Sequence, residues 1–109
     1  MNITLSHGGV YKDCYIEFHR YSNNRPALVI YHDNEALLKA SVNIPDHPVP
    51  EGYICIKDWN ENEGVLKSLI ENNIIEPAIH YIPVGYCDAA VCKLIKELNH
   101  GTKTYGRFS

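Results

Sequence analysis

Apolar and polar residues alternate along the first half of the chain, as they do in strands with one buried face. The period of two is clear in segments 14–19 and 38–44. Segment 27–32 is apolar almost throughout, which is typical of a central strand. Segments 22–26 and 33–35 are rich in Asn, Asp and Pro, the residues that favour turns. We therefore expect an antiparallel meander in this part of the chain.

A second pattern, with helical period, follows a proline-rich connection at 45–52 and a short strand at 53–57. It predicts a helix over residues 60–72. Asn60 is a good N-cap, and Glu63, three residues on, can return the capping-box hydrogen bond. Asp58 and Glu61 offer the same pair two residues earlier. The apolar stripe consists of Val65, Leu66, Leu69 and Ile70.

The last third of the chain predicts two further strands, at 74–82 and 89–95, around a turn at 83–86. Residues 88–97 could instead form a short helix, because Ala, Leu and Lys favour one, but we prefer the strand. The expected fold class is α+β. It consists of a curved antiparallel sheet of five or six strands with one main helix packed on one face.

The chain of 109 residues has the size of one domain, so we expect a single domain over residues 1–109. Residues 1–8 and 99–109 are expected to be frayed ends. Apolar residues make up 45% of the chain and the net charge is −3, which argues against sequence-independent binding to nucleic acid. The sequence shows neither a secretory signal nor a membrane span, so we expect a cytoplasmic protein with no membrane partner.

The residues that could support catalysis or metal binding are scattered. The four cysteines form no Cys-x-x-Cys pair, and we expect them to be buried, reduced thiols; they are Cys14, Cys55, Cys87 and Cys92. The histidines that could converge on a metal from separate strands are His19, His32 and His80. Because no two histidines have His-x-His spacing, we expect neither a metal site nor a cofactor. His47 lies beside Asp46, and a carboxylate that orients a histidine is one part of a general base. A solvated loop position is the simpler interpretation of His47.

Tyrosine is over-represented, with eight residues against two phenylalanines. Tyr15 and Tyr21 share the predicted outer face of one strand, and Tyr31 is expected nearby. Exposed tyrosines suit protein interfaces and ligand pockets, although tyrosine also simply favours strands. Trp59 lies beside an acidic group that includes Glu61 and Glu63. Helix capping accounts for part of this group, and the rest is a candidate contact edge.

Segment 57–64, Lys-Asp-Trp-Asn-Glu-Asn-Glu-Gly, resembles the most specific block of a family of small accessory proteins. Members of that family are carried by bacterial phages, plasmids and integrative elements. Segments 42–45, 83–86 and 90–94 support the resemblance, which covers roughly residues 27–95. It implies an accessory protein of a mobile element, with no assigned reaction and no catalytic residues to carry over.

The leading functional hypothesis is therefore a non-enzymatic protein that binds and inhibits a host or defence protein. Its candidate binding residues are Tyr15, Tyr21, Tyr31, Trp59, Glu61 and Glu63. An alternative is a sponge for a signalling nucleotide, with phosphates held by Arg20, Arg25 or Lys39. A third hypothesis is a small hydrolase that uses Cys or His. A homodimer is compatible with each of them.

Overall fold

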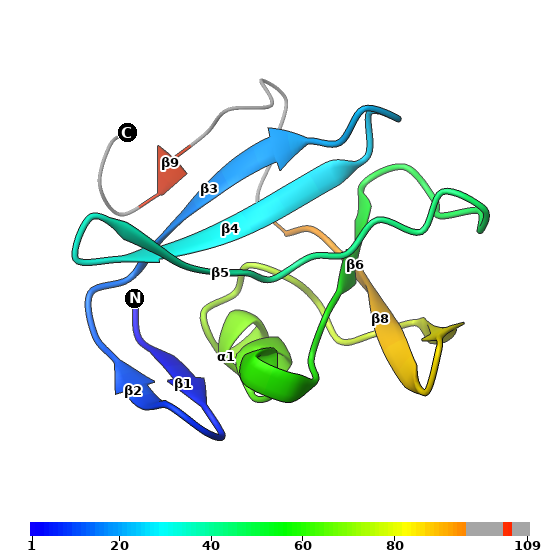
Figure 1. Cartoon of the computed structure of the whole chain (residues 1–109). Helices are drawn as coiled ribbons and strands as arrows, with labels where there is room; N and C mark the ends of the chain where they lie inside the picture. The colour runs from blue at the N-terminus through cyan, green and yellow to red at the C-terminus, as the bar shows by residue number, and fades with distance from the viewer. Residues whose placement is uncertain (96–103, 106–109) are drawn as a thin grey trace.

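In the part of the chain that the structure describes, the strands form three antiparallel sheets, whereas the sequence predicts one sheet of five or six strands (Figure 1). The computed structural model describes residues 1–95 and 104–105. Its strands are β1 (Ile3–Leu5), β2 (Gly9–Tyr11), β3 (Tyr15–Arg20), β4 (Pro26–His32), β5 (Glu35–Lys39), β6 (Tyr53–Ile56), β7 (His80–Val84), β8 (Cys87–Lys93) and β9 (Thr104–Tyr105). The sheets have the orders β1-β2, β5-β4-β3-β9 and β6-β8-β7. A 3₁₀-helix, η1 (Asn60–Asn62), precedes the main helix α1 (Val65–Glu71). The fold class is α+β, as predicted.

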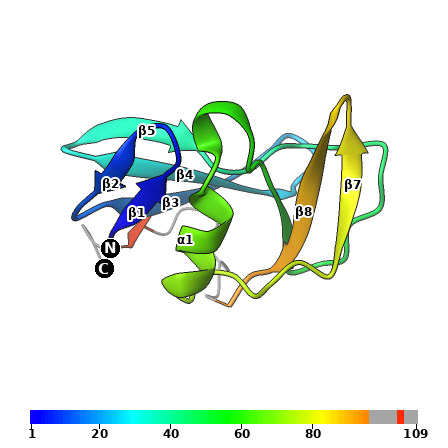
Figure 2. The same cartoon turned by 90° about the horizontal axis from the view of Figure 1, so that it is seen from below.

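The N-terminal residues are part of the core, so the prediction of a frayed segment 1–8 is wrong. Ile3 is fully buried in β1, which pairs with β2. The ammonium group and the carbonyl of Met1 both hydrogen-bond to the main chain of Cys14. Figure 2 shows the β1–β2 hairpin on one side of α1 and strands β8 and β7 on the other. The predicted frayed tail 99–109 lies outside the described residues, apart from β9.

Strand β8 confirms the preference for a strand over residues 88–93; residues 96–97 of the ambiguous segment 88–97 lie outside the described residues. The strands β6 and β8 have two buried faces. Ile54 and Ile56 face the main core together with β1, β3, β4 and α1. Cys55 and Val91 face a second, smaller core. The chain between β5 and β6 covers this second core with Val42, Ile44 and Val49, so the proline-rich connection is anchored to the core.

The sheet divides because the chain changes partners after β5. The alternation at 38–44 predicts a longer strand, but β5 ends at Lys39. The Ala40 amide donates to Leu28 of β4, while the Ala40 carbonyl accepts from Lys57 beyond β6. Ser41 then forms a single bridge with Ile56. Residues 40–42 therefore join two sheets instead of continuing one.

The helix begins later than predicted, and its cap differs. Asn60 has a positive φ of 56° and lies in η1, so it does not act as an N-cap. Gly64 is the residue before α1, with a φ of 103°. The Asp58 carboxylate accepts hydrogen bonds from the amides of Gly64 and Leu66, both at 3.0 Å. After α1 the chain passes through Asn73, which has a positive φ of 59°, a conformation that asparagine tolerates at the end of a helix.

Asp58→Ala should lower the free energy of unfolding by about 1.5 kcal/mol, because two amides at the start of α1 lose a charged acceptor. The expected fall in melting temperature is about 6–12 °C. Thermal and urea unfolding would test this. Asp46→Ala is the matched control, because Asp46 is exposed in the proline-rich connection. Equal stability of the two variants would contradict the assignment of Asp58 as the cap.

No helix in the described part of the chain is long and apolar enough to cross a membrane.

Candidate functional site

The structure distributes the six predicted binding residues over three places. Tyr15 and Tyr31 lie on the outer face of the β3–β4 pair, and Tyr21 and Glu61 line one pocket. Trp59 and Glu63 flank η1 and have different partners. The predicted residues therefore do not form one continuous surface.

The expectation that Tyr15 is exposed is not met. Tyr15 and Tyr31 are direct cross-strand partners, and their rings stack with centroids 5.2 Å apart and an interplanar angle of 7°. Only 8% of Tyr15 is accessible to solvent, while Tyr31 is half-buried. Tyr15 thus stabilises the strand pair and cannot serve as an exposed anchor for a partner.

Glu17 joins Tyr31 to His19 on this same face. Its Oε1 atom lies 3.2 Å from the Tyr31 hydroxyl, which donates to it, and 2.6 Å from His19 Nε2. Partial burial raises the pKa of Tyr31, and the hydrogen bond to the Glu17 carboxylate raises it further. The carboxylate orients the imidazole of His19, and this pairing was not anticipated from the sequence.

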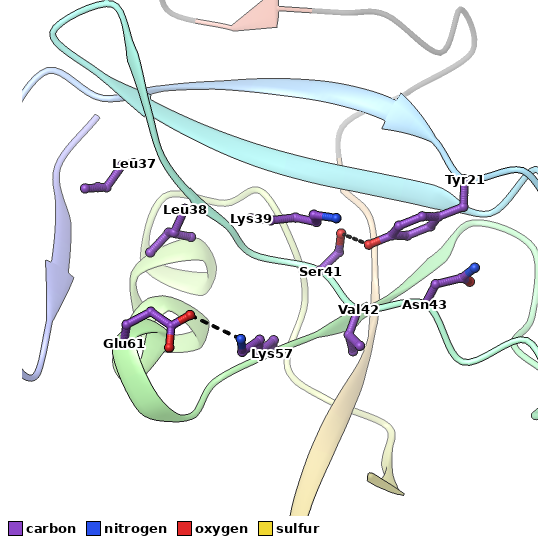
Figure 3. Close-up of a pocket in the computed structure, with 9 residues that line it drawn as sticks. All are labelled: Tyr21, Leu37, Leu38, Lys39, Ser41, Val42, Asn43, Lys57 and Glu61. Carbon is purple, nitrogen blue, oxygen red and sulfur yellow. Dashed lines mark hydrogen bonds and ion pairs between the residues drawn. The ribbon is translucent and has the colours of Figure 1, made fainter.

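Tyr21 and Glu61 line an open pocket of about 420 Å³ at the junction of the two larger sheets (Figure 3). The Tyr21 hydroxyl lies 2.9 Å from Ser41 Oγ, which also accepts a hydrogen bond from the Leu28 amide at 3.0 Å. The pKa of Tyr21 is raised, mainly because its hydroxyl is partly buried. Lys39 Nζ lies 5.6 Å from the centroid of the Tyr21 ring, within range of a cation–π interaction. Residues 40–42, which join the sheets, therefore also help to build this pocket.

Each acid of the edge predicted around Trp59 has a partner within the chain. Glu61 pairs with Lys57 at 3.2 Å, and Glu63 lies 3.3 Å from His7 Nε2. A hydrogen bond from its own main-chain amide lowers the pKa of the Glu61 carboxyl, and Lys57 lowers it further. Asp58 caps α1. The group therefore offers less free negative charge than the sequence suggests.

Trp59 is half-buried against the second core. The same core includes Val42, Ile44 and Val49, so the tryptophan packs together with the chain between β5 and β6. Mutation of Trp59 would therefore affect folding as well as any contact with a partner.

Three of the four cysteines are poor candidates for the nucleophile of a hydrolase. The buried thiols are those of Cys14, Cys55 and Cys92. Burial is the largest contribution to the raised pKa of each thiol, and the pKa of Cys92 rises to about 12. A thiol with a raised pKa contains little of the reactive thiolate at neutral pH. Cys87 is half-buried at the start of β8.

Within the described part of the chain, no group of three or more His, Cys, Asp or Glu residues is arranged to hold a metal ion.

Two strongly exposed aromatic residues of the described chain were not among the predicted binding residues. Tyr86 is fully exposed at the tip of the β7–β8 hairpin, and Tyr81 is 56% exposed on β7. Ile79, just before β7, is 54% exposed. The sequence predicts a strand at 74–82 and a turn at 83–86, but β7 begins only at His80 and continues to Val84, and Gly85 and Tyr86 alone form the turn. What the sequence could not indicate is that β7 lies at the edge of its sheet.

Comparison of the chain with known protein families, characterised proteins and solved structures gives no match.

Proposed function

We propose that this chain is a non-enzymatic accessory protein that binds and inhibits a host or defence protein in the host-cell cytoplasm. The observation that carries the proposal is the exposure of Ile79, Tyr81 and Tyr86 on and beside one hairpin. Tyrosine is enriched in protein interfaces and in the residues that dominate their binding energy. We call these three residues the hairpin patch.

The hairpin offers a stable support for such a contact. Strand β7 pairs with β8 along its whole length, and only two residues, Gly85 and Tyr86, connect the strands. Ile82, within the same strand, is buried in the second core. The exposed rings are therefore carried by a well-packed hairpin, and little conformational entropy of the main chain is lost when they meet a partner.

The partner is expected to contact side chains rather than to extend the sheet. Strand β7 is an edge strand, but it contains the exposed residue Pro83, which has no amide hydrogen. Proline on an edge strand is a common protection against pairing with a further strand. Tyr21 and Glu61 remain accessible candidates for a second contact, whereas Tyr15 does not.

Replacement of both Tyr81 and Tyr86 by serine should reduce capture of the partner at least about tenfold, because two anchoring rings are lost. The melting temperature should stay within a few degrees of the wild-type value, because both side chains are exposed. Tagged wild-type and variant proteins would be incubated with host lysate, and the captured partner would be quantified by mass spectrometry.

Val10→Ser is the matched control, because Val10 is 57% exposed but lies on β2, away from the hairpin patch. It should capture as much partner as the wild type. Equal capture by wild type and by the Tyr81→Ser/Tyr86→Ser variant would overturn the proposal, as would equal losses for that variant and for Val10→Ser.

A further inference from the structure

We propose that the pocket between β5 and η1 binds a small organic anion that carries a phosphate or carboxylate group. This pocket is separate from the hairpin patch, and the inference does not depend on the proposed protein partner. Its volume, about 420 Å³, lies within the range of about 300–1,000 Å³ that is typical of ligand sites.

The polar groups around the pocket are mainly hydrogen-bond donors. Lys39 and Lys57 both contribute ammonium groups, and Glu61 is the acidic residue of the lining. Lys57 is paired with Glu61, but no described carboxylate lies within ion-pair distance of Lys39. The pocket thus has a positive excess in a chain whose net charge is −3.

Two neutral side chains add donors to the same pocket. Asn43 accepts a hydrogen bond from Asn23 through Oδ1 at 3.1 Å, which orients the amide and leaves its own N–H groups for another acceptor. Ser41 Oγ accepts from the Leu28 amide, so its hydroxyl hydrogen can be donated to the Tyr21 oxygen. The Tyr21 hydroxyl then keeps its own hydrogen for a ligand.

An acceptor-rich anion satisfies these donors, and the remaining lining suits the rest of an organic molecule. Leu37, Leu38 and Val42 are apolar residues of the pocket wall. Figure 3 shows Lys39 extending toward Tyr21, with Leu38 and Val42 on the neighbouring stretch of chain. The anionic group is placed near Lys39, because this charge has no described carboxylate partner, and the apolar part rests on the leucine and valine side chains.

Amide chemical shifts of the isotope-labelled full chain would test this assignment. The probes are phenyl phosphate, benzoate, inorganic phosphate and uncharged phenol. We expect phenyl phosphate or benzoate to shift the amide signals of residues 37–43, Lys57 and Glu61 in a saturable way, while phenol leaves them unchanged. Comparison of the two organic anions identifies the preferred head group. Comparison with inorganic phosphate shows whether the organic part contributes.

Lys39→Met should weaken binding of phenyl phosphate about threefold to fivefold, as expected for one solvent-exposed charge pair. Lys39→Glu should abolish it. Lys93→Met, at an exposed lysine on β8, is the matched control and should leave the affinity unchanged. The site would be refuted by equal affinities of wild type and Lys39→Met. It would also be refuted by shifts spread over unrelated lysines, or by phenol binding as well as phenyl phosphate.

Discussion

Replacement of Gly64 by alanine should lower the free energy of unfolding by about 3 kcal/mol or more. Gly64 has a φ of 103°, a conformation that residues with a Cβ atom rarely adopt. A Cβ atom there would also lie 2.7 Å from the Thr4 carbonyl oxygen and 3.1 Å from the Cα atom of Leu5. These are main-chain atoms of β1, so relief of the contact requires displacement of the strand. Urea unfolding would measure the loss.

The close approach at Gly64 is part of a larger contact between β1 and α1. The Thr4 amide donates to Ser68 Oγ at 2.9 Å, and the Ser6 amide donates to the Glu63 carbonyl at 2.7 Å. Movement of β1 away from a new methyl group would break these bonds as well. The cost of Gly64→Ala therefore exceeds that of backbone strain alone.

Gly52→Ala separates the cost of backbone strain from the cost of the steric contact with β1. Gly52 has a similar φ of 86°, but no atom lies within 4 Å of the position that a Cβ atom would take. Its replacement should cost about 1 kcal/mol, from backbone strain alone. If both variants lost the same stability, the contact between Gly64 and β1 would not be important for folding.

Local patterns in the sequence predicted the elements of this fold better than their assembly. The turn between β3 and β4 has Asn24 at a positive φ, and the turn before β5 has Asp33 and Asn34 at positive φ, as those residue types indicate. The alternation at 14–19 and the apolar run at 27–32 correspond to β3 and β4. These features depend on neighbours in the sequence, which is why they could be read from it.

The division into three sheets depends on contacts between distant residues. Alternation at 38–44 indicates a strand, but it does not indicate that Ala40 bonds to Leu28 on one side and to Lys57 on the other. The prediction of the helix cap was wrong for the same reason, because the observed cap depends on residues that are not close in sequence. Asp58 reaches amides six and eight residues further along the chain, through a turn that the capping-box pattern does not describe.

The candidate site was predictable only in part. Tyr15 and Tyr31 were expected close together, and they are cross-strand partners. Period-two alternation does not indicate whether other residues cover the face on which they lie. In the structure Tyr15 is buried, although it was expected to be exposed. Tyr21 and Glu61, 40 positions apart in sequence numbering, share a pocket because the sheet junction brings the residue after β3 and η1 to the same place. No sequence pattern within either segment encodes that proximity.

Asn62 holds this junction together, and Asn62→Asp should cost more than about 3 kcal/mol at neutral pH. Asn62 is 1% exposed, and its Nδ2 atom donates to the carbonyls of Lys39 at 2.7 Å and of Lys57 at 3.2 Å. An aspartate carboxylate would place a buried negative charge against two carbonyl oxygens. The same change should displace the two lysines that line the pocket.

The loss caused by Asn62→Asp should depend on pH in a defined direction. The protonated acid can donate one hydrogen bond and the carboxylate none, so folding should raise the pKa of the introduced carboxyl group above its unfolded value of about 3.9. Below about pH 4 both states are protonated and the loss is smallest. As the pH rises, only the unfolded state ionises, and stability should fall by about 1.4 kcal/mol per pH unit until the folded pKa is reached. Urea unfolding from acidic to neutral pH measures this slope relative to the wild type.

Asn34→Asp provides the comparison, because Asn34 is exposed in the turn before β5 and its replacement introduces the same charge. Its stability relative to the wild type should change little with pH, since the carboxyl stays hydrated in both states. A loss for Asn62→Asp that did not depend on pH would mean that water or another donor reaches the two carbonyls. In that case the buried amide would not be what fixes Lys39 and Lys57 in their positions around the pocket.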